Sequence, residues 1–353
     1  MSNNSQVICE IGPGTDMPGG MLTVIQTIMK SSELKKFDLV HIASASAAGK
    51  VRTFATSLIR YFGMCIRGKV ALAHIHMSER GSCFRAIVFI KISRLFNIPV
   101  IVHSHGSEFE NYYNSMSARG RRTFNGAMRY ASRVLVLTNG WIKFWRQIVK
   151  EDKITVLPNS VKAQDSYDKK YLINNRLNIL FLGYIGTRKG TFDLINAIRL
   201  LRDSKHKIHL VVGGNGEIEH AKSSVREFNL QSQVDVAGWL NAAQKERAFE
   251  DADVLVLPSV YESFGIVILE AFAHKVPAIC GDGGYSKEVV SDGVDGYVVE
   301  SGNVDQIANR LTDLSDFQKL EKFGLAGYRK VKENYSEKIV MRRLRQIYDS
   351  DKR

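Results

Sequence analysis

The chain has 353 residues, a length typical of two domains, and its 44% hydrophobic and 24% charged residues are usual for a globular protein. No apolar run approaches the roughly 18 residues of a membrane span, and the first residues lack the layout of a signal peptide. The four cysteines show no paired spacing, so we expect reduced thiols in a cytoplasmic protein.

The positive charge is concentrated in the first half of the chain. Residues 1–165 carry 22 Lys and Arg against 10 Asp and Glu, whereas residues 166–353 carry 27 against 26. The first half thus holds +12 of the net charge of +13. A region this basic favours an anionic partner such as a membrane surface, a phosphorylated substrate or nucleic acid. The alternative is a basic domain that is merely soluble.

Short apolar runs alternate with helical patterns along the first half. The near-continuous hydrophobicity of these runs is typical of parallel strands buried on both faces. The predicted strands are 7–12, 37–43, 71–77, 99–106, 133–138 and 154–159. The predicted helices between them are 21–32, 50–68, 80–96, 119–131 and 140–150.

The second half restarts the same cycle. Its predicted strands are 178–183, 207–214, 234–238, 253–259 and 276–282, and segments 317–334 and 336–350 are predicted helices. The fold class is therefore α/β, with two Rossmann-like domains that each contain a parallel sheet. We expect a first domain at 1–165, a second at 166–335 and a terminal helix at 336–353 that packs back on the first. The polar stretch 162–176 is the expected linker.

The stretch YESFGIVILEA (261–271) places two glutamates next to a predicted helix start. Ligands of open parallel sheets bind beyond the carboxyl ends of the strands, so two facing domains would form a cleft there. Glu262 falls in the loop after a strand, and Glu270 falls about 7 Å along the helix that begins near Gly265. A helix N-terminus favours phosphate, which would leave Glu270 to bind ribose hydroxyls and Glu262 to bind a sugar. The alternative is a solvated Glu262 and a Glu270 paired with a core base.

This stretch resembles the Glu-x7-Glu element of retaining glycosyltransferases with the GT-B fold, especially glycosyltransferase family 4. Seven further segments resemble motifs of that family in the same order, so the resemblance spans roughly residues 10–350. They are PGGM (18–21), HSHGSEF (103–109), VLPNSV (156–161), FLGYIGTRKG (181–190), VVGGNGE (211–217), VAGWL (236–240) and GGYSKEVVSDGVDGYVVE (283–300). The resemblance implies two sheets facing a central cleft, a nucleotide-sugar donor, retention of configuration and no metal or other cofactor.

The resemblance also assigns site residues. The expected catalytic residues are His105, Glu262, Lys189 and Arg188. The expected donor-binding residues are Gly19, Gly20, Gly183, Gly214, Gly238, Phe264, Gly265, Ile266 and Glu270. The charges of Lys189 and Arg188 would stabilise a leaving diphosphate, and the alternative is a basic turn on the surface.

Two positions depart from the family pattern. The residue after Gly183 is usually arginine and here is Tyr184, which cannot neutralise phosphate; Arg188 would take over from four residues later. The segment that contains Glu288 is one residue longer than in the family.

Two His-x-His pairs end neighbouring predicted strands. His103 and His105 end one strand, where we expect them to face opposite sides, and His74 and His76 end the other. Such pairs can indicate a metal site. Neither a carboxylate nor a cysteine stands at metal-ligand spacing, so we expect no metal.

Segments 50–69 and 117–130 mix Lys and Arg with apolar residues. Helices of this kind bind anionic membrane surfaces, although each alone also fits a core helix with a solvated basic face. No nucleic-acid-binding module is recognisable, so we expect no nucleic acid partner.

We therefore expect a retaining glycosyltransferase of the hexosyltransferase type. It would transfer a sugar from a nucleotide donor, UDP-linked, to a saccharide acceptor that is lipid-linked, in capsule, exopolysaccharide or lipopolysaccharide synthesis. It would act in the cytoplasm, peripherally on the inner face of the membrane. Two alternatives remain open: a nucleotide-sugar epimerase of the same fold, and a non-catalytic partner that binds sugar nucleotides, which Tyr184 favours.

Overall fold

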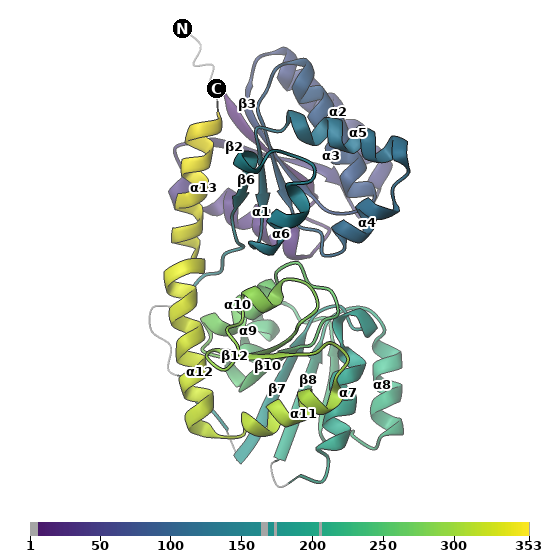
Figure 1. The fold of residues 1–353 in the computed structure, drawn as a ribbon, viewed down its shortest axis with the longest axis vertical. Coiled ribbons are helices and arrows are strands. Elements are labelled where there is room, and N and C mark those ends of the chain that lie inside the picture. Colours follow the sequence, from purple (N-terminus) through teal and green to yellow (C-terminus); the bar gives the residue numbers. More distant parts are fainter. Residues whose placement is uncertain (1–5, 164–168, 173–174, 205–206, 353) are drawn as a thin grey trace. The chain divides into compact units, whose positions relative to one another are not determined.

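The computed structural model describes residues 6–163, 169–172, 175–204 and 207–352, which form two separate α/β units (Figure 1). The first unit consists of Met1–Asn159 and Glu337–Arg353, and the second is Ser160–Ser336. Each unit has one sheet whose neighbouring strands all run parallel. This architecture confirms the predicted fold class of two Rossmann-like domains.

The described part of the first domain contains a six-stranded sheet with strand order β2-β1-β3-β4-β5-β6. Its strands are β1 (Val7–Pro13), β2 (Asp38–Ala45), β3 (Val70–Met77), β4 (Val100–Ser104), β5 (Arg133–Val136) and β6 (Ile154–Val156). All eight residues of β3 are buried, which explains the near-continuous hydrophobicity of its sequence. The strand order reverses between β1 and β3, so loops diverge there and leave room for a ligand.

Helices cover both faces of the first sheet. They are α1 (Gly20–Lys30), α2 (Lys50–Ile66), α3 (Gly81–Leu95), α4 (Phe109–Ser115), α5 (Ala118–Tyr130), α6 (Gly140–Trp145) and α13 (Glu337–Asp351). Helices α2, α3 and α5 gather on one face (Figure 1). On the other face, Leu344 and Tyr348 of α13 join Ile8, Leu72 and Ile101 of the sheet in one hydrophobic core. The helix at 337–351 thus completes the core of the first domain.

The described part of the second domain also contains a six-stranded sheet, in the order β12-β11-β10-β7-β8-β9. Its strands are β7 (Arg176–Leu182), β8 (Lys207–Gly213), β9 (Val234–Gly238), β10 (Val254–Leu257), β11 (Ala278–Gly281) and β12 (Gly296–Val299). Its helices are α7 (Thr191–Leu200), α8 (Ile218–Glu227), α9 (Ala242–Asp251), α10 (Ile266–Ala273), α11 (Val304–Asp313) and α12 (Phe317–Lys330). The strand order reverses between β7 and β10, and β12 is a strand that the sequence analysis did not predict.

The expected linker at 162–176 is described only in part, because residues 164–168 and 173–174 lie outside the described residues. Within the described part, Lys169 is 9% exposed and donates hydrogen bonds to the carbonyl oxygens of Phe249 and Glu250. The Tyr171 hydroxyl donates to the Lys275 carbonyl at 2.5 Å. Residues 169 and 171 are therefore packed on the second domain.

Candidate functional site

The reversal point of the second sheet brings together Lys189 and Glu262. Lys189 ends the 3₁₀ turn Thr187–Lys189 after β7, and Glu262 lies in the loop after the neighbouring strand β10. The Lys189 ammonium donates a hydrogen bond to Glu262 Oε2, and the two side chains are 13% and 10% exposed. Two residues that the sequence analysis predicted to be catalytic therefore form a partly buried ion pair at the carboxyl ends of two strands.

Glycine residues fix the position of Glu262. The backbone N–H of Tyr285 donates to the Glu262 carbonyl at 2.8 Å. Gly284 has a φ of 83°, and a Cβ there would lie 2.3 Å from the same carbonyl oxygen. Gly265 also has a positive φ, of 80°, and precedes α10 without a capping side chain from the described residues. The free N-terminus of α10 therefore lies three residues after Glu262, as the sequence predicted for an anion site.

Glu270 lies inside α10, where its carboxylate has one paired and one open oxygen. Lys245 of α9 donates to Glu270 Oε1 at 2.7 Å. Oε2 is buried and accepts no hydrogen bond from the described residues. The sequence analysis treated pairing of Glu270 with a base and binding of a ribose as alternatives. In the structure, one oxygen is paired with Lys245 and the other remains available as an acceptor. Lys245 was missed, although its place on α9, which starts just after the VAGWL segment, was a usable signal.

The predicted glycines of this domain end three adjacent strands. The N–H of Gly183 donates to the Gly213 carbonyl at 3.1 Å, and that of Gly214 to the Gly238 carbonyl at 2.7 Å. A Cβ at Gly214 would lie 1.7 Å from the Gly183 oxygen, so only glycine permits this approach. Gly183, Gly214 and Gly238 therefore lie close together beyond β7, β8 and β9.

Other predicted residues occupy different surroundings. Phe264 is 1% exposed and packs its ring on Tyr335, so its side chain belongs to the core. Ile266 is the first residue of α10 and is half-buried. Gly19 and Gly20 lie at the start of α1 in the first domain, just after β1.

Tyr184, at the family's arginine position, is 55% exposed. Arg188 donates to the Tyr261 carbonyl at 3.3 Å, one residue before Glu262. Arg188 therefore lies beside the ion pair of Lys189 and Glu262. Glu288 is exposed in the 3₁₀ turn Ser286–Glu288.

The reversal point of the first sheet holds four histidines. His74 and His76 of β3, and His103 of β4, are buried, and His105 just after β4 is partly buried. The rings of His103 and His105 have centroids 4.2 Å apart. The expectation that these two residues face opposite sides is wrong, because residues two apart on a strand share a face.

Three of these histidines lie close enough together to suggest a metal site. Ligand nitrogens of His74, His76 and His103 all lie within 4.8 Å of one another. A tetrahedral zinc site with Zn–N bonds of about 2.0–2.1 Å needs nitrogens only about 3.3 Å apart. The rings of His74 and His103 are also nearly parallel, at 8° with centroids 5.4 Å apart, so their in-plane lone pairs do not converge. These residues fit a metal poorly.

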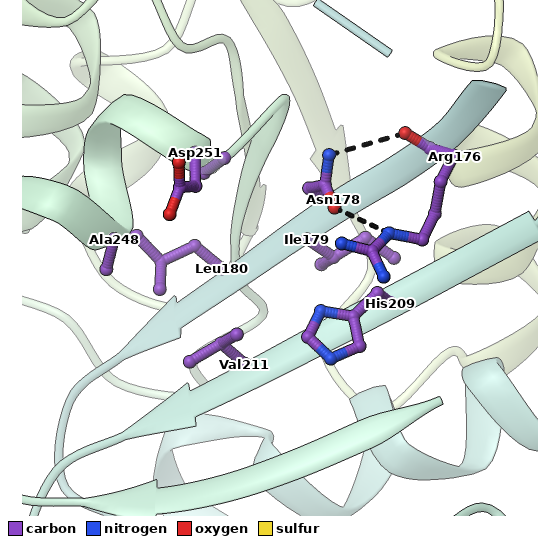
Figure 2. Close-up of a pocket in the computed structure, with 9 residues that line it drawn as sticks. Arg176, Asn178, Ile179, Leu180, His209, Val211, Ala248 and Asp251 are labelled. Atoms are coloured by element: carbon purple, nitrogen blue, oxygen red, sulfur yellow. Dashed lines mark hydrogen bonds between the residues drawn. The ribbon is translucent and has the colours of Figure 1, made fainter. Parts of the chain in front are cut away.

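Figure 2 shows a cavity of about 260 Å³ elsewhere in the second domain, formed by β7, β8 and α9. Arg176, the first residue of β7, donates through Nε to Asn178 Oδ1 at 2.9 Å, and His209 of β8 lies next to Arg176 (Figure 2). These residues are in the amino-terminal halves of their strands. The cavity therefore lies away from the loops that carry Lys189 and Glu262, and we assign it no part in the candidate site.

Comparison with known protein families gives a match that lies in the second domain. Residues 163–330 match the family described as glycosyl transferases group 1. This match covers slightly less than half of the chain and most of the second domain. The matched segment contains Lys189, Glu262 and Glu270, so the candidate site lies within the part of the chain that is similar to group 1 glycosyl transferases.

Relatives and solved structures extend the likeness. An uncharacterized 41.2 kDa protein in the cps region of Klebsiella pneumoniae is 24% identical over 84% of this chain and 86% of its own length. The capsular polysaccharide biosynthesis glycosyltransferase CapM of Staphylococcus aureus is 26% identical over 58% of this chain and 57% of its own length. The structure of Anabaena Alr3699/HepE in complex with UDP and glucose covers 98% of this chain and 100% of its own, with a TM-score of 0.79 and 15% identity. The chain thus has the GT-B fold.

Proposed function

We propose that this protein is a retaining glycosyltransferase that transfers a hexose from UDP to a lipid-linked saccharide in cell-surface polysaccharide synthesis. The observation that carries the proposal is the Lys189–Glu262 pair next to the free N-terminus of α10, within the segment that is similar to group 1 glycosyl transferases. The capsular relatives support the pathway, and the UDP and glucose bound to Alr3699/HepE support the donor. The resemblance to family 4 supports retention.

In this proposal, binding of the donor separates Lys189 from Glu262, and each residue then binds a different part of the donor. Lys189 and Glu262 neutralise each other in a largely buried place, where an unpaired charge would be costly. A bound diphosphate would attract the Lys189 ammonium and release Glu262 to accept hydrogen bonds from sugar hydroxyls. Arg188 and the N–H groups of α10 add positive potential as charge develops on the departing phosphate. These groups supply the charge stabilisation, and we propose that no bound metal is required.

Glu270 would bind the ribose. Its open Oε2 is a buried acceptor, and a carboxylate that accepts from two ribose hydroxyls is the usual arrangement in dinucleotide folds. Lys245 would hold the carboxylate in place through Oε1. Gly183, Gly214 and Gly238 would leave space for the backbone to approach the nucleotide.

The first domain carries a surface suited to an anionic membrane. Ile59, Phe62 and Ile66 of α2 lie on one helical face and are 74%, 40% and 62% exposed. Phe84 and Leu95 of the adjacent α3 are 61% and 69% exposed. Exposed basic residues on and next to these helices are Lys50, Arg52, Arg60, Arg67, Lys69, Lys91 and Arg94. Apolar side chains flanked by cations favour peripheral binding to the inner face of the membrane, where a lipid-linked acceptor would be found.

In the described residues, no helix combines the length and the hydrophobicity needed to cross a membrane. The membrane contact that we propose rests on the exposed apolar and basic side chains of α2 and α3.

The test is an incubation of the full chain with UDP-sugars, with and without lipid-linked saccharides. We expect sugar transfer only with an acceptor, and nuclear magnetic resonance of the product should show the anomeric configuration of the donor. A free epimerised sugar without any acceptor would identify an epimerase. Binding of UDP-sugars without turnover under any condition would identify a non-catalytic partner.

A further inference from the structure

Glu10 is a fully buried carboxylate at the reversal point of the first sheet, and the proposed function leaves it unexplained. It lies on β1 and is 0% exposed. In the register of the sheet it stands next to His74 of β3. A buried carboxylate is stable only when its oxygens are hydrogen-bonded, so its partners define its role.

Both carboxylate oxygens of Glu10 have donors. Oε1 accepts a hydrogen bond from the Tyr348 hydroxyl of α13, and Oε2 accepts from His76 Nε2 at 2.9 Å. His74 Nδ1 lies 2.7 Å from the Tyr348 oxygen and 3.1 Å from Glu10 Oε2. The carboxylate of Glu10 on β1 is therefore surrounded by residues of two other elements, β3 and α13.

The network continues from His76 to His105. His76 Nδ1 lies 3.0 Å from His105 Nε2, with ring planes 18° apart. Two neutral imidazole nitrogens at this distance share one proton, so one ring donates and the other accepts. A chain of hydrogen bonds thus runs from the buried Glu10 to the partly buried His105.

The charge states along this chain follow from its surroundings. Burial opposes the ionisation of Glu10, but His74 and His76 outweigh it and hold the pKa of this carboxyl well below its usual range. Burial, with the neighbouring His74, lowers the pKa of His76 to about 4, and burial with His76 and His74 lowers that of His105 well below 6.5. At neutral pH the chain is therefore a carboxylate followed by two neutral imidazoles.

We propose that Glu10 and His76 are positioning residues that fix His105 as the tautomer protonated at Nε2, with Nδ1 free to accept a hydrogen bond from a sugar hydroxyl. A carboxylate can only accept, so His76 must carry its proton at Nε2. Its Nδ1 is then an acceptor, and the shared proton must belong to His105 Nε2. Nδ1 of His105 has no hydrogen bond within the described residues and is left with a lone pair.

The opposite pair of tautomers, with His76 and His105 both protonated at Nδ1, is unfavourable. It would place the lone pair of His76 Nε2 against the carboxylate at 2.9 Å, between two fully buried side chains, where repulsion is strong because the local dielectric constant is low. The role of His105 toward a sugar rests on the proposed function, whereas its tautomer follows from the network alone.

The first experiment measures tautomers in the wild-type chain. In protein labelled with ¹⁵N-histidine, nitrogen chemical shifts distinguish Nε2–H from Nδ1–H rings, and His76→Gln and His105→Gln variants assign the signals. We expect both residues in the Nε2–H form at pH 7. An Nδ1–H or doubly protonated His105, or metal found in the purified protein at stoichiometric amounts, would overturn the proposal.

The second experiment measures turnover in Glu10→Gln. The glutamine amide can also donate to His76 Nε2, so the preference for one tautomer is lost. We expect the His105 signal to become mixed and kcat to fall roughly 10- to 100-fold, the scale found when the partner that orients a metal-bound histidine is removed. UDP affinity should stay within about twofold, because UDP binding is proposed for the other domain.

Tyr348→Phe and Tyr61→Phe form a matched pair for this test. Each removes one buried hydroxyl of the first domain; the Tyr348 hydroxyl bonds to Glu10, whereas that of Tyr61 bonds to Ser93 at 2.7 Å. We expect Tyr348→Phe to lower kcat and Tyr61→Phe to leave it unchanged. Equal kcat values for Glu10→Gln, Tyr348→Phe and the parent would overturn the positioning role. A wild-type chain without any transferase activity would instead refute the proposed function, and the tautomer measurement would still decide whether the network acts as inferred.

Discussion

The two domains share a parallel-sheet layout and place different chemistry where their strand order reverses. In the first, between β1 and β3, a buried carboxylate is enclosed by Tyr348, His74 and His76. In the second, between β7 and β10, a lysine and a glutamate pair next to a free helix N-terminus. The first arrangement is closed and sets the state of one partly buried ring. The second can exchange its partners, so it suits a charged ligand.

The largest expected effect concerns the second domain. Lys189→Ala should reduce turnover by roughly 100-fold or more, the scale seen when a preorganised donor to a developing charge is removed. Initial rates with a UDP-sugar measure this. The control is Lys222→Ala, which removes a lysine that pairs with Glu219 on the surface of α8. If Lys189→Ala has the same rate as the control, the phosphates bind elsewhere. The second domain would then lack the charged-ligand site that distinguishes it from the first.

Acid should selectively weaken the first domain. The pKa of His76 is lowered to about 4 in the folded state, whereas the unfolded chain has a value near 6.5. Below pH 6.5 the unfolded state therefore binds more protons, and the free energy of unfolding falls as pH falls toward 4. From pH 7 to pH 5 the loss for His76 alone is about 2 kcal/mol, and His103 and His105 shift in the same direction.

Denaturant unfolding at the two pH values measures this loss. In a Trp239→Phe background the remaining tryptophans, Trp141 and Trp145, both report on the first domain. The pH dependence should shrink in His76→Phe. A first domain that is equally stable at pH 7 and pH 5 would contradict the charge states assigned to the histidines.

The two domains should also differ in membrane binding, which we assign to the first domain. Reversing Arg60, Arg67 and Lys69 to glutamate should weaken binding to anionic vesicles roughly 100-fold or more, because each cation near such a surface contributes on the order of 1 kcal/mol. Salt should release the parent protein, since exposed charges are screened beyond about 8–10 Å. Sedimentation with neutral and anionic vesicles measures both effects.

Two controls accompany this measurement. Reversal of Lys207, Arg226 and Arg247, three exposed cations of the second domain, should leave vesicle binding unchanged. UDP affinity should be unchanged in both triple variants. If the parent protein sediments equally with neutral and anionic vesicles at low salt, the membrane proposal is wrong. A soluble anionic acceptor would then be favoured.

The smallest expected effect distinguishes Glu270 from Glu262 by their contributions to UDP binding. Glu270→Ala should weaken UDP binding about 10-fold, because hydrogen bonds to a charged group contribute roughly 1.5–3 kcal/mol. Lys245→Gln should weaken it less, since partly exposed ion pairs contribute at most about 1 kcal/mol. Glu262→Ala should spare UDP binding and reduce turnover with the full donor. Calorimetry with UDP decides this, and parent-like affinity in Glu270→Ala would make the ribose assignment wrong.

Much of the fold could be predicted because local patterns determine it. The apolar runs gave eleven of the strands now described, and the helix that starts after Gly265 was expected from its turn residues. Strand β12 was missed because Gly296–Val299 has only four residues and follows a turn-rich segment. Helix α4 was missed for a similar reason, since seven residues rich in Tyr and Asn show little apolar periodicity.

The candidate site divides in the same way. Lys189, Glu262 and Glu270 could be found because they lie in recognisable segments near strand ends. The partners of these residues could not, because Lys245 meets Glu270 only through the packing of α9 on its neighbours. The network of Glu10 was further out of reach, since the residues that contact it are separated by up to 338 positions. Such contacts follow from topology and leave no periodic signal.

The place of α13 in the core of the first domain has a consequence for biosynthesis. Ribosomes release a chain from its amino end, and domains ordinarily fold in that order. Here Ile8, Leu72 and Ile101 emerge early, but the helix that covers them, with Leu344 and Tyr348, is translated only after the second domain. The second domain, contiguous from Ser160 to Ser336, can therefore finish folding first. Until residue 351 leaves the exit tunnel, the residues of the first core lack the helix that covers them, and Glu10 lacks the Tyr348 hydroxyl as a hydrogen-bond donor.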